Sequence, residues 1–432
     1  MQLLLSLSIA LFAGLMLSRL AKLAQLPAVT AYLVTGILIG PYLLGALGIE
    51  GLGFISAENV KQFALLSDLA LGFIAFSIGN EFRLSQLKQI GKQATIVGIF
   101  QAVFTTVLVD IALIALHFAI PEALPLPAAI ILGAVASATA PAATLMVVRQ
   151  YKAKGPVTNI LLPVVALDDA VGLVIFAISF GIAKALMNGN VDLISIILEP
   201  LLEVVGSLLL GALMGYLFSF FEKFFHSRSK RMAMSVTFVL MTVALSKLSF
   251  TIGGVHVGFS SLLVCMMLGT VFCNICDFSE ELMDRIDRWT APLFVLFFVL
   301  SGAELELSVF TNLTVVLIGL AYIASRSLGK YFGASLSSSM SKCEPNIKKY
   351  LGITLLPQAG VALGMALKAK ELGSVGSIVA NITLFSVLIY ELVGPLLTKI
   401  ALTKAGEIDK EGKTSAREIA KKEMHAKAAQ SK

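Results

Sequence analysis

The segment PVTNILLPVVALDDAVGLVIFAISFGIAKALM, residues 156–187, places two adjacent carboxylates, Asp168 and Asp169, in the middle of an apolar run. The run is long enough to cross a hydrocarbon core about 30 Å thick as a helix. A charged residue at the bilayer centre costs about 2.5–3.5 kcal/mol on insertion scales, so the pair indicates a function: binding a cation, or taking up and releasing protons. A structural pair fixed by neighbouring hydroxyls is the alternative, and it is disfavoured because two charges are a costly way to make a hydrogen bond.

The rest of the chain is equally apolar. Of its 432 residues, 57% are hydrophobic and 14% are charged, whereas a soluble domain has about 25% charged residues. The sequence therefore predicts an all-α, polytopic membrane protein. Hydropathy and helix breakers predict thirteen transmembrane helices, at residues 2–18, 26–44, 61–79, 93–118, 124–148, 156–186, 194–222, 232–248, 255–273, 289–302, 310–337, 348–367 and 374–398.

Lys and Arg residues gather in every second predicted loop, and the opposite loops hold acids. By the positive-inside rule this predicts an external N-terminus and a cytoplasmic C-terminus in a cell inner membrane. Topology thus explains the formal charge of +6 without a nucleic-acid partner. Residues 1–402 form the predicted transmembrane domain and residues 403–432 a charged cytoplasmic tail.

Two classes of protein are disfavoured by the sequence. No glycine-rich phosphate-binding fingerprint follows a strand, which argues against an ATP-driven pump. Cys273 and Cys276, in the run CNIC, are too few to form a structural zinc site, which normally has four ligands. We expect no cofactor and no enzymatic activity.

Two of the predicted helices are interrupted. Pro141 lies inside the fifth span, in SATAPAAT at 137–144, and Pro357 and Gln358 lie inside the twelfth. A proline inside a helix removes a backbone hydrogen bond and clashes with the preceding turn. Thirteen spans divide into six, a linking helix and six, and matching interruptions in two inverted halves indicate the central binding site of a secondary transporter.

Polar side chains near these breaks are candidate site residues. Thr139 can cap a broken helix or bind a small cation. Arg326 and Lys330 are four residues apart on one face of the eleventh span, and either could neutralise Asp168. Only the lysine can also lose its proton when desolvated, which favours it for a proton cycle; the alternative is that it reaches the cytoplasmic surface and leaves Arg326 as the partner.

The available ligands are carboxylate, carbonyl and hydroxyl oxygens, which hard cations prefer. Asp169 and Asp168 are therefore the candidate Na⁺ ligands, and Ser137, Pro141, Gln358 and Arg326 are expected to line the site. If a cation and protons compete for the same carboxylates, alternating access converts that competition into exchange.

Four stretches together resemble one known family. They are ATAPAAT at 138–144, ALDDAVGLVIF at 166–176, GK at 329–330 and LPQAGVALGMAL at 356–367. Their order and spacing resemble the cation/proton antiporter superfamily, specifically its paired-aspartate bacterial Na⁺/H⁺ antiporters of the NapA and NhaA type.

The resemblance implies an NhaA-like fold, with two inverted six-helix repeats and two crossed discontinuous helices. It also implies a homodimer, in which a mobile core, drawn in part from residues 61–186 and 310–398, moves against a dimerisation domain. By resemblance, Asp169 is the ion-binding carboxylate, Asp168 pairs with Lys330, and Thr139 supplies the hydroxyl at the break. By the same resemblance, paired aspartates with a lysine imply electrogenic exchange, with two protons for one Na⁺.

Two positions depart from the family pattern. Ala140 stands where some relatives have an aspartate after the break threonine, and Gln358 stands where some have a charged residue. These departures leave the choice of cation open. We therefore predict a Na⁺(Li⁺)/H⁺ antiporter, with a K⁺/H⁺ antiporter on the same scaffold or a cation-coupled organic-acid symporter as alternatives.

Overall fold

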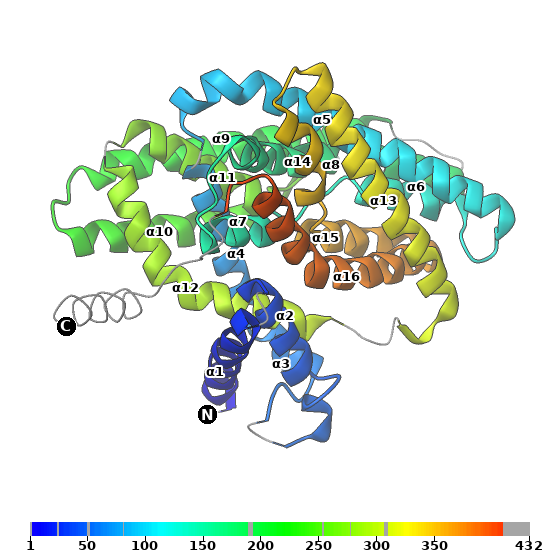
Figure 1. Cartoon of the computed structure of the whole chain (residues 1–432), viewed down its shortest axis with the longest axis horizontal. Coiled ribbons are helices and arrows are strands. Elements are labelled where there is room, and N and C mark those ends of the chain that lie inside the picture. Colours follow the sequence, from blue (N-terminus) through cyan, green and yellow to red (C-terminus); the bar gives the residue numbers. More distant parts are fainter. Residues whose placement is uncertain are drawn as a thin grey trace, which may run out of the picture.

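The chain forms a bundle of helices (Figure 1), and the described residues also include a short β-hairpin. The computed structural model describes residues 2–23, 26–49, 52–80, 82–188, 193–252, 255–276, 278–305 and 310–408. The helices of the first half are α1 (Gln2–Leu23), α2 (Ala28–Ile39), α3 (Ala57–Lys61), α4 (Ala64–Asn80), α5 (Leu84–Ala119), α6 (Leu126–Val135), α7 (Pro141–Gln150) and α8 (Pro156–Asn188). Those that follow are α9 (Leu193–Glu222), α10 (Arg228–Ser246), α11 (Ser261–Ile275), α12 (Ser279–Glu304), α13 (Leu313–Met340), α14 (Pro345–Thr354), α15 (Gly360–Ala369) and α16 (Ser374–Lys404).

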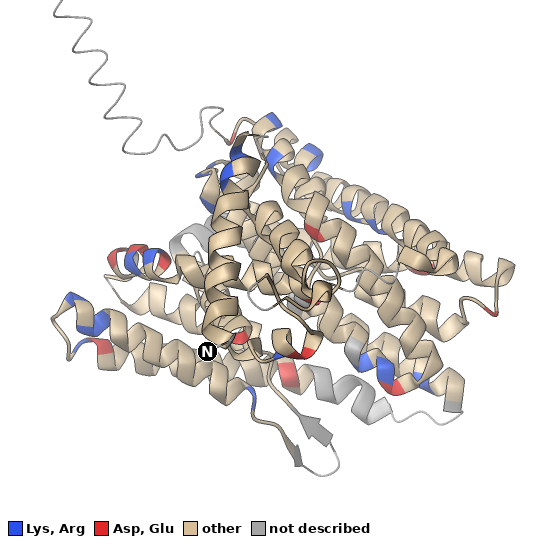
Figure 2. Ribbon diagram, turned by 90° about the horizontal axis from the view of Figure 1, so that it is seen from below, with Lys and Arg blue, Asp and Glu red and all other residues tan. Residues whose placement is uncertain are grey.

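Seven helices in the described part are long and apolar enough to cross a membrane: α1, α5, α8, α9, α12, α13 and α16. Four shorter apolar helices, α2, α4, α6 and α11, accompany them. Most of the ribbon carries neither acid nor base, and Lys and Arg lie mainly near helix ends (Figure 2). The expectation of a polytopic helical membrane protein is confirmed.

Both predicted interruptions are present. The predicted span 124–148 is two helices, α6 and α7, separated by residues 136–140, and the predicted span 348–367 is two helices, α14 and α15, separated by residues 355–359. Pro141 is the first residue of α7, where its missing N–H leaves no hydrogen bond unmade.

Two predicted boundaries were wrong. The span predicted at 255–273 begins as a helix only at Ser261, because Val255–Val257 (β2) pairs with Phe250–Ile252 (β1) in an antiparallel hairpin. The β-branched residues of both strands favour that pairing. Helix α12 begins at Ser279 rather than 289, because the polar stretch SEELMDRIDR continues the helix ahead of its apolar part.

Glycines allow the closest helix packing. Gly36 of α2 lies against the backbone of α12, and Gly302 of α12 lies against the backbone of α2. Gly79 of α4 and Gly269 of α11 make the same reciprocal contact. None of the four positions has space for a side chain, so these pairs pack backbone against backbone, as small residues permit in membrane proteins.

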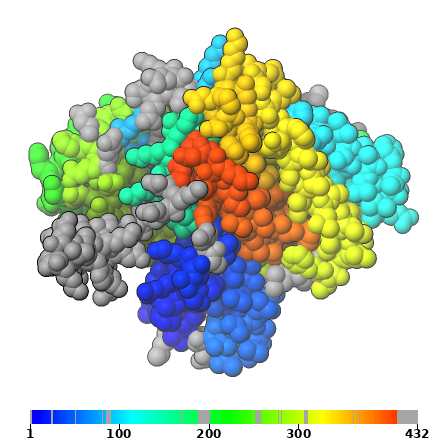
Figure 3. Space-filling model, in the orientation of Figure 1, coloured from blue at the N-terminus to red at the C-terminus, as the bar shows by residue number. Residues whose placement is uncertain are grey.

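Helix α16, near the end of the chain, lies in the middle of the face seen in Figure 3, between α13 and the N-terminal helices. It packs against α6, α7, α13, α14 and α15. Helix α5 packs along α13 and α8. Both interrupted helices are thus enclosed by α5, α8, α13 and α16, which supply the side chains of the site.

Candidate functional site

The two helix breaks contact each other directly. The backbone N–H of Ala140 in the first break donates to the carbonyl of Pro357 in the second, at 2.8 Å. The Thr139 hydroxyl lies 3.2 Å from the carbonyl of Leu355. Backbone N–H and C=O groups that lie outside a helix within a membrane need hydrogen-bond partners. Here each break supplies such partners to the other.

Asp168 lies beside the first break and is fully buried. Its Oδ2 accepts a hydrogen bond from the Thr139 hydroxyl at 2.7 Å and lies 2.9 Å from the Lys330 ammonium, which is also fully buried. Its Oδ1 accepts from the Gln101 amide. Lys330 donates in turn to the Gln101 side-chain carbonyl at 3.0 Å and to the backbone carbonyl of Ser137. The carboxylate and the ammonium are thus held in a closed hydrogen-bond network.

Arg326 has a different role from Lys330. Its guanidinium donates to the carbonyls of Ala136 and Ala138 in the first break, at 3.0 and 2.6 Å, and to that of Leu356 in the second, at 2.7 Å. It also lies 4.5 Å from the centre of the Tyr390 ring. The carbonyl ends of α6 and α14 carry partial negative charge, so Arg326 joins both breaks. Of the two bases that the sequence left open, Lys330 pairs with Asp168.

Gln358 also links the breaks. Its amide donates to the carbonyl of Val135 at 2.9 Å and to the Tyr322 hydroxyl at 3.0 Å, and its oxygen accepts from Ser386 at 3.3 Å. Ser137 donates its hydroxyl to the carbonyl of Ala134 at 2.7 Å, and its own backbone carbonyl accepts from Lys330.

The side chain of one predicted residue is not described, and one contact residue was missed. Asp169 belongs to α8, but its side chain lies outside the described residues. Gln101 was not predicted, although it contacts both charged groups of the pair. Gln101 lies alone among apolar residues in the run GIFQAVF of α5. A buried amide needs hydrogen-bond partners, so this pattern could have predicted a contact residue.

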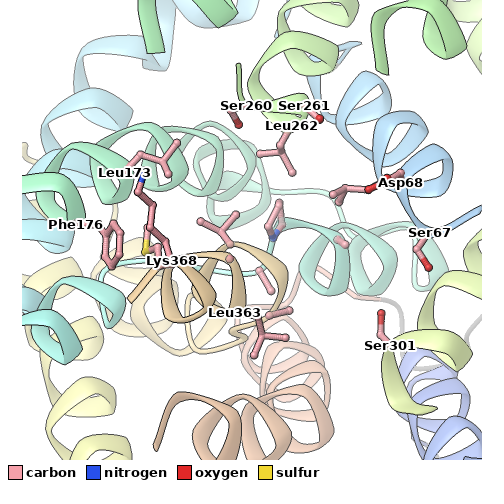
Figure 4. Close-up of a pocket in the computed structure, with 18 of the residues that line it drawn as sticks. Ser67, Asp68, Leu173, Phe176, Ser260, Ser261, Leu262, Ser301, Leu363 and Lys368 are labelled. Carbon is pink, nitrogen blue, oxygen red and sulfur yellow. The ribbon is translucent and has the colours of Figure 1, made fainter. Parts of the chain in front are cut away.

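A cavity of about 640 Å³ reaches the first break. Ala140, Pro141 and Ala142 line it from the break, and Ala359 lines it from the second break. Its charged lining residues are Asp68, Lys184, Glu203, Lys247, Glu304, Lys368, Glu371 and Glu391. Figure 4 shows Asp68 and Lys368 on opposite sides of the space, with Leu262 and Leu363 between them. The cavity can bring water and small cations close to the backbone that holds Thr139 and Asp168.

The opposite approach to the breaks is filled by apolar side chains. Val147, Ile160, Val164, Leu351 and Leu355 belong to one cluster of buried residues contributed by α5, α7, α8, α13, α14 and the end of α16. The structure therefore has one open and one closed side. Among the described residues, no group of three or more His, Cys, Asp or Glu is arranged to hold a metal ion.

Comparison of the sequence with protein families gives one match along most of the chain. The family model described as "Sodium/hydrogen exchanger, transmembrane" matches residues 7–404. A Na⁺/H⁺ antiporter of Synechocystis sp., NhaS4, is 23% identical over 87% of the chain and 91% of its own length. The high-affinity Na⁺/H⁺ antiporter NhaS3 of the same organism is 26% identical over 84% of the chain and 82% of its own length.

A third relative, the ammonium/H⁺ antiporter subunit AmhT of Alkalihalophilus pseudofirmus, is 23% identical over 66% of each chain. Among solved structures, the sodium proton antiporter MjNhaP1 of Methanocaldococcus jannaschii at pH 8 superposes with a TM-score of 0.63 and 22% identity, covering 94% of this chain and 97% of its own. An electron-microscopy structure of the same antiporter gives a TM-score of 0.68 at 19% identity, with 93% and 94% covered. These structures share the fold.

Proposed function

Because the chain belongs to the sodium/hydrogen exchanger family, whose members are transporters rather than enzymes, we propose that it exchanges Na⁺ or Li⁺ for protons at Asp168 and Asp169. One observation carries the proposal: Asp168 and Lys330 form a fully buried ion pair beside two touching helix breaks. Membrane proteins rarely bury such charges without using them, so an ionisable pair at this depth favours an ion or proton pathway.

The mechanism is competition for negative charge. In the state described, the Lys330 ammonium supplies the positive charge that Asp168 needs, at 2.9 Å. A cation that binds Asp169 and Asp168 when the opposite side opens would replace that charge, and Lys330 would then release its proton or move away. Protons that enter through the cavity would displace the cation and restore the ion pair. The family resemblance of the paired aspartates and the lysine implies that two protons move for each Na⁺, and exchange is then electrogenic.

The finer fold assignment is part of the proposal. Counting α6 with α7 and α14 with α15 as single interrupted spans, and leaving out the short α3, gives thirteen spans: six, the linking helix α9, and six. Helix packing supports an inverted repeat. The contact of α2 with α12 has its counterpart in α11 with α4, and α5 with α6 has its counterpart in α13 with α14. The reciprocal glycine contacts occur in both members of the first of these pairs.

The proposed orientation follows from charge. The loops after α7, α9 and α13 carry basic residues, and the cavity opens at the opposite helix ends, where Asp68, Glu304 and Glu371 lie. We therefore place the N-terminus and the cavity outside a cell inner membrane and the charged tail, residues 403–432, in the cytoplasm. The paired-aspartate branch, the homodimer and the mobile core domain belong to the same proposal.

The test is exchange in proteoliposomes, followed by a pH-sensitive dye after addition of Na⁺, Li⁺, K⁺ or ammonium. Na⁺ and Li⁺ are expected to move protons. A response to K⁺ alone would overturn the sodium assignment and favour the K⁺/H⁺ alternative. Ammonium belongs in the series because one relative is named as an ammonium/H⁺ antiporter subunit.

The site is tested by replacing Asp169 with Asn, which keeps the size of the side chain and removes its charge. Asp169→Asn is expected to abolish exchange, and the variant should elute from size exclusion as the wild type does. Glu344→Gln is the matched control, because Glu344 is exposed and its side chain caps no helix. Full exchange by Asp169→Asn would remove Asp169 from the site.

A further inference from the structure

Glu391 of α16 is a second buried acid, outside the hydrogen-bond network of Asp168. Glu391 is 6% exposed, it lines the cavity, and its Oε2 has no hydrogen-bond partner among the described residues. In the described part of the chain, no salt bridge includes it. A buried carboxylate without such partners is costly as an anion, so something from the cavity has to neutralise it.

Its position is at the depth of the helix breaks. The preceding residue, Tyr390, stacks on Arg326, and Gly394, one turn later, packs against Pro357 of the second break. The cavity that Glu391 lines also reaches Ala140 and Pro141 of the first break. An ion or proton at Glu391 is therefore on the same water-accessible route as the candidate transport site.

The charged groups around Glu391 add to the need for neutralisation. Glu304, at the end of α12, is close enough to Glu391 for the two carboxylates to repel each other. Other charges on the cavity wall are Asp68 of α4, Lys184 of α8, Glu203 of α9, Lys247 after α10, Lys368 of α15 and Glu371. Lys247 is paired with Asp68 at 2.8 Å.

Apart from α15, which carries Lys368 on the cavity wall, the helices packed against α16 supply no evident counter-charge. Helices α2 and α6 carry no charged residue. Arg326 of α13 donates to backbone carbonyls, and Arg149 of α7 pairs with Asp287 at 2.6 Å. Lys348 and Lys349 of α14 lie in its first turns, at the end of the molecule away from the cavity.

We propose that Glu391 is a proton-binding site in the cavity, which loads a proton from the cavity water and holds it next to the two helix breaks. A proton is favoured over an alkali ion, because a proton needs only the carboxylate of Glu391, whereas a metal ion would need several oxygen ligands around it. The role in transport rests on the proposed exchange activity, whereas protonation of Glu391 can be measured without it.

The direct test is infrared difference spectroscopy of the full chain in lipid vesicles, recorded between acidic and alkaline buffers. A protonated carboxyl group has a C=O stretch that the carboxylate lacks. One such band is expected to titrate in the wild type, to be lost in Glu391→Gln, and to remain in the matched control Glu371→Gln, at an exposed cavity residue. Glu304→Gln is expected to keep the band and change its pH midpoint, because a repelling neighbour is removed.

Three results would overturn the proposal. The Glu391→Gln spectrum could equal that of the wild type, or the band assigned to Glu391 could fail to respond to pH, as expected for a permanently protonated structural group. Alternatively, Na⁺ at constant pH, with choline as control, could erase that band in a variant with both Asp168 and Asp169 replaced by Asn, which would make Glu391 an alkali-ion site.

Transport measurements then separate this proposal from the proposed function. If wild-type vesicles exchange Na⁺ for protons, Glu391→Gln is expected to lose part of the dependence of the rate on external pH, while Glu371→Gln keeps it. An unchanged external pH profile contradicts the loading role. If the wild type does not exchange at all, the proposed function fails, and the infrared band still reports on Glu391.

Discussion

At the scale of single residues, the charge of Lys330 and that of Asp168 depend on each other. Both side chains are fully buried and lie 2.9 Å apart. Removing one partner of a buried pair costs about 3–5 kcal/mol, because the other charge is left without compensation. Replacing both by neutral groups of similar size costs less, because no uncompensated charge is left.

A double-mutant cycle tests this dependence. Lys330→Gln and Asp168→Asn are each expected to lower the thermal unfolding midpoint in detergent, and the double variant should regain part of the loss. Losses that simply add would mean that the two groups do not stabilise each other. Thr139 and Gln101 remain in place in all three variants, so the comparison isolates the ion pair.

Arg326 is expected to affect folding rather than charge transfer, because it donates to three backbone carbonyls and to no carboxylate in the described structure. Arg326→Gln should lower the yield and thermal stability of the protein but leave the charge moved per Na⁺ unchanged in the fraction that folds. Lys330→Gln should change the charge moved per Na⁺. Currents on a solid-supported membrane, normalised to the amount of folded protein, measure the difference. The opposite pattern would assign the proton cycle to Arg326.

At the scale of helices, the N-terminus of α8 is held by a residue from the far end of the chain. The Glu407 carboxylate accepts from the backbone N–H groups of Val157 and Thr158 at 2.7 and 2.8 Å and from the Thr158 hydroxyl at 2.6 Å. Negative charge at a helix N-terminus also opposes the partial positive charge there. A residue just beyond the end of α16 thus fixes the helix that carries Asp168.

Replacing Glu407 with Ala should cost about 0.5–2 kcal/mol, the usual cost of losing a helix cap. Hydrogen exchange should become faster at the first turn of α8, and the thermal midpoint should fall. Glu344→Ala is the control at the N-terminus of α14, where the side chain makes no capping hydrogen bond. Equal effects of the two variants would show that the Glu407 contact does not stabilise α8.

Local sequence signals predicted the helices and their breaks better than the contacts between them. Pro141 and Pro357 interrupt apolar runs wherever those runs lie in the fold, so the breaks could be read from the chain itself. The choice between Lys330 and Arg326 could not, because both are on one helix and their partners lie on α8 and on two breaks far away in sequence. The capping by Glu407 was missed for the same reason: nothing in the tail sequence indicates that it returns to residue 157.

At the scale of the whole molecule, the asymmetry of the bundle determines from which side water and ions can reach the site. The cavity leads to Ala140 and Pro141 from one end, and apolar side chains such as Val164 and Leu351 fill the other. An exchanger has to close the first approach before it opens the second, since a route open at both ends would let ions leak. If the protein exchanges ions as proposed, the structure corresponds to one end state of alternating access, and in the proposed orientation that state is open to the outside.

Labelling of single cysteines tests this assignment. The four native cysteines are buried, so a membrane-impermeant thiol reagent should leave them largely unmodified in intact cells. Glu371→Cys, at the exposed rim of the cavity, is expected to be labelled from outside, and Glu344→Cys, exposed before α14, only after the membrane is opened. Glu344 precedes α14 and Glu371 follows α15. If the two helices together form a single span, the two cysteines have to be labelled from opposite sides of the membrane. Labelling of both from outside would contradict the single interrupted span, and the reverse pattern would invert the molecule and make the cavity cytoplasmic.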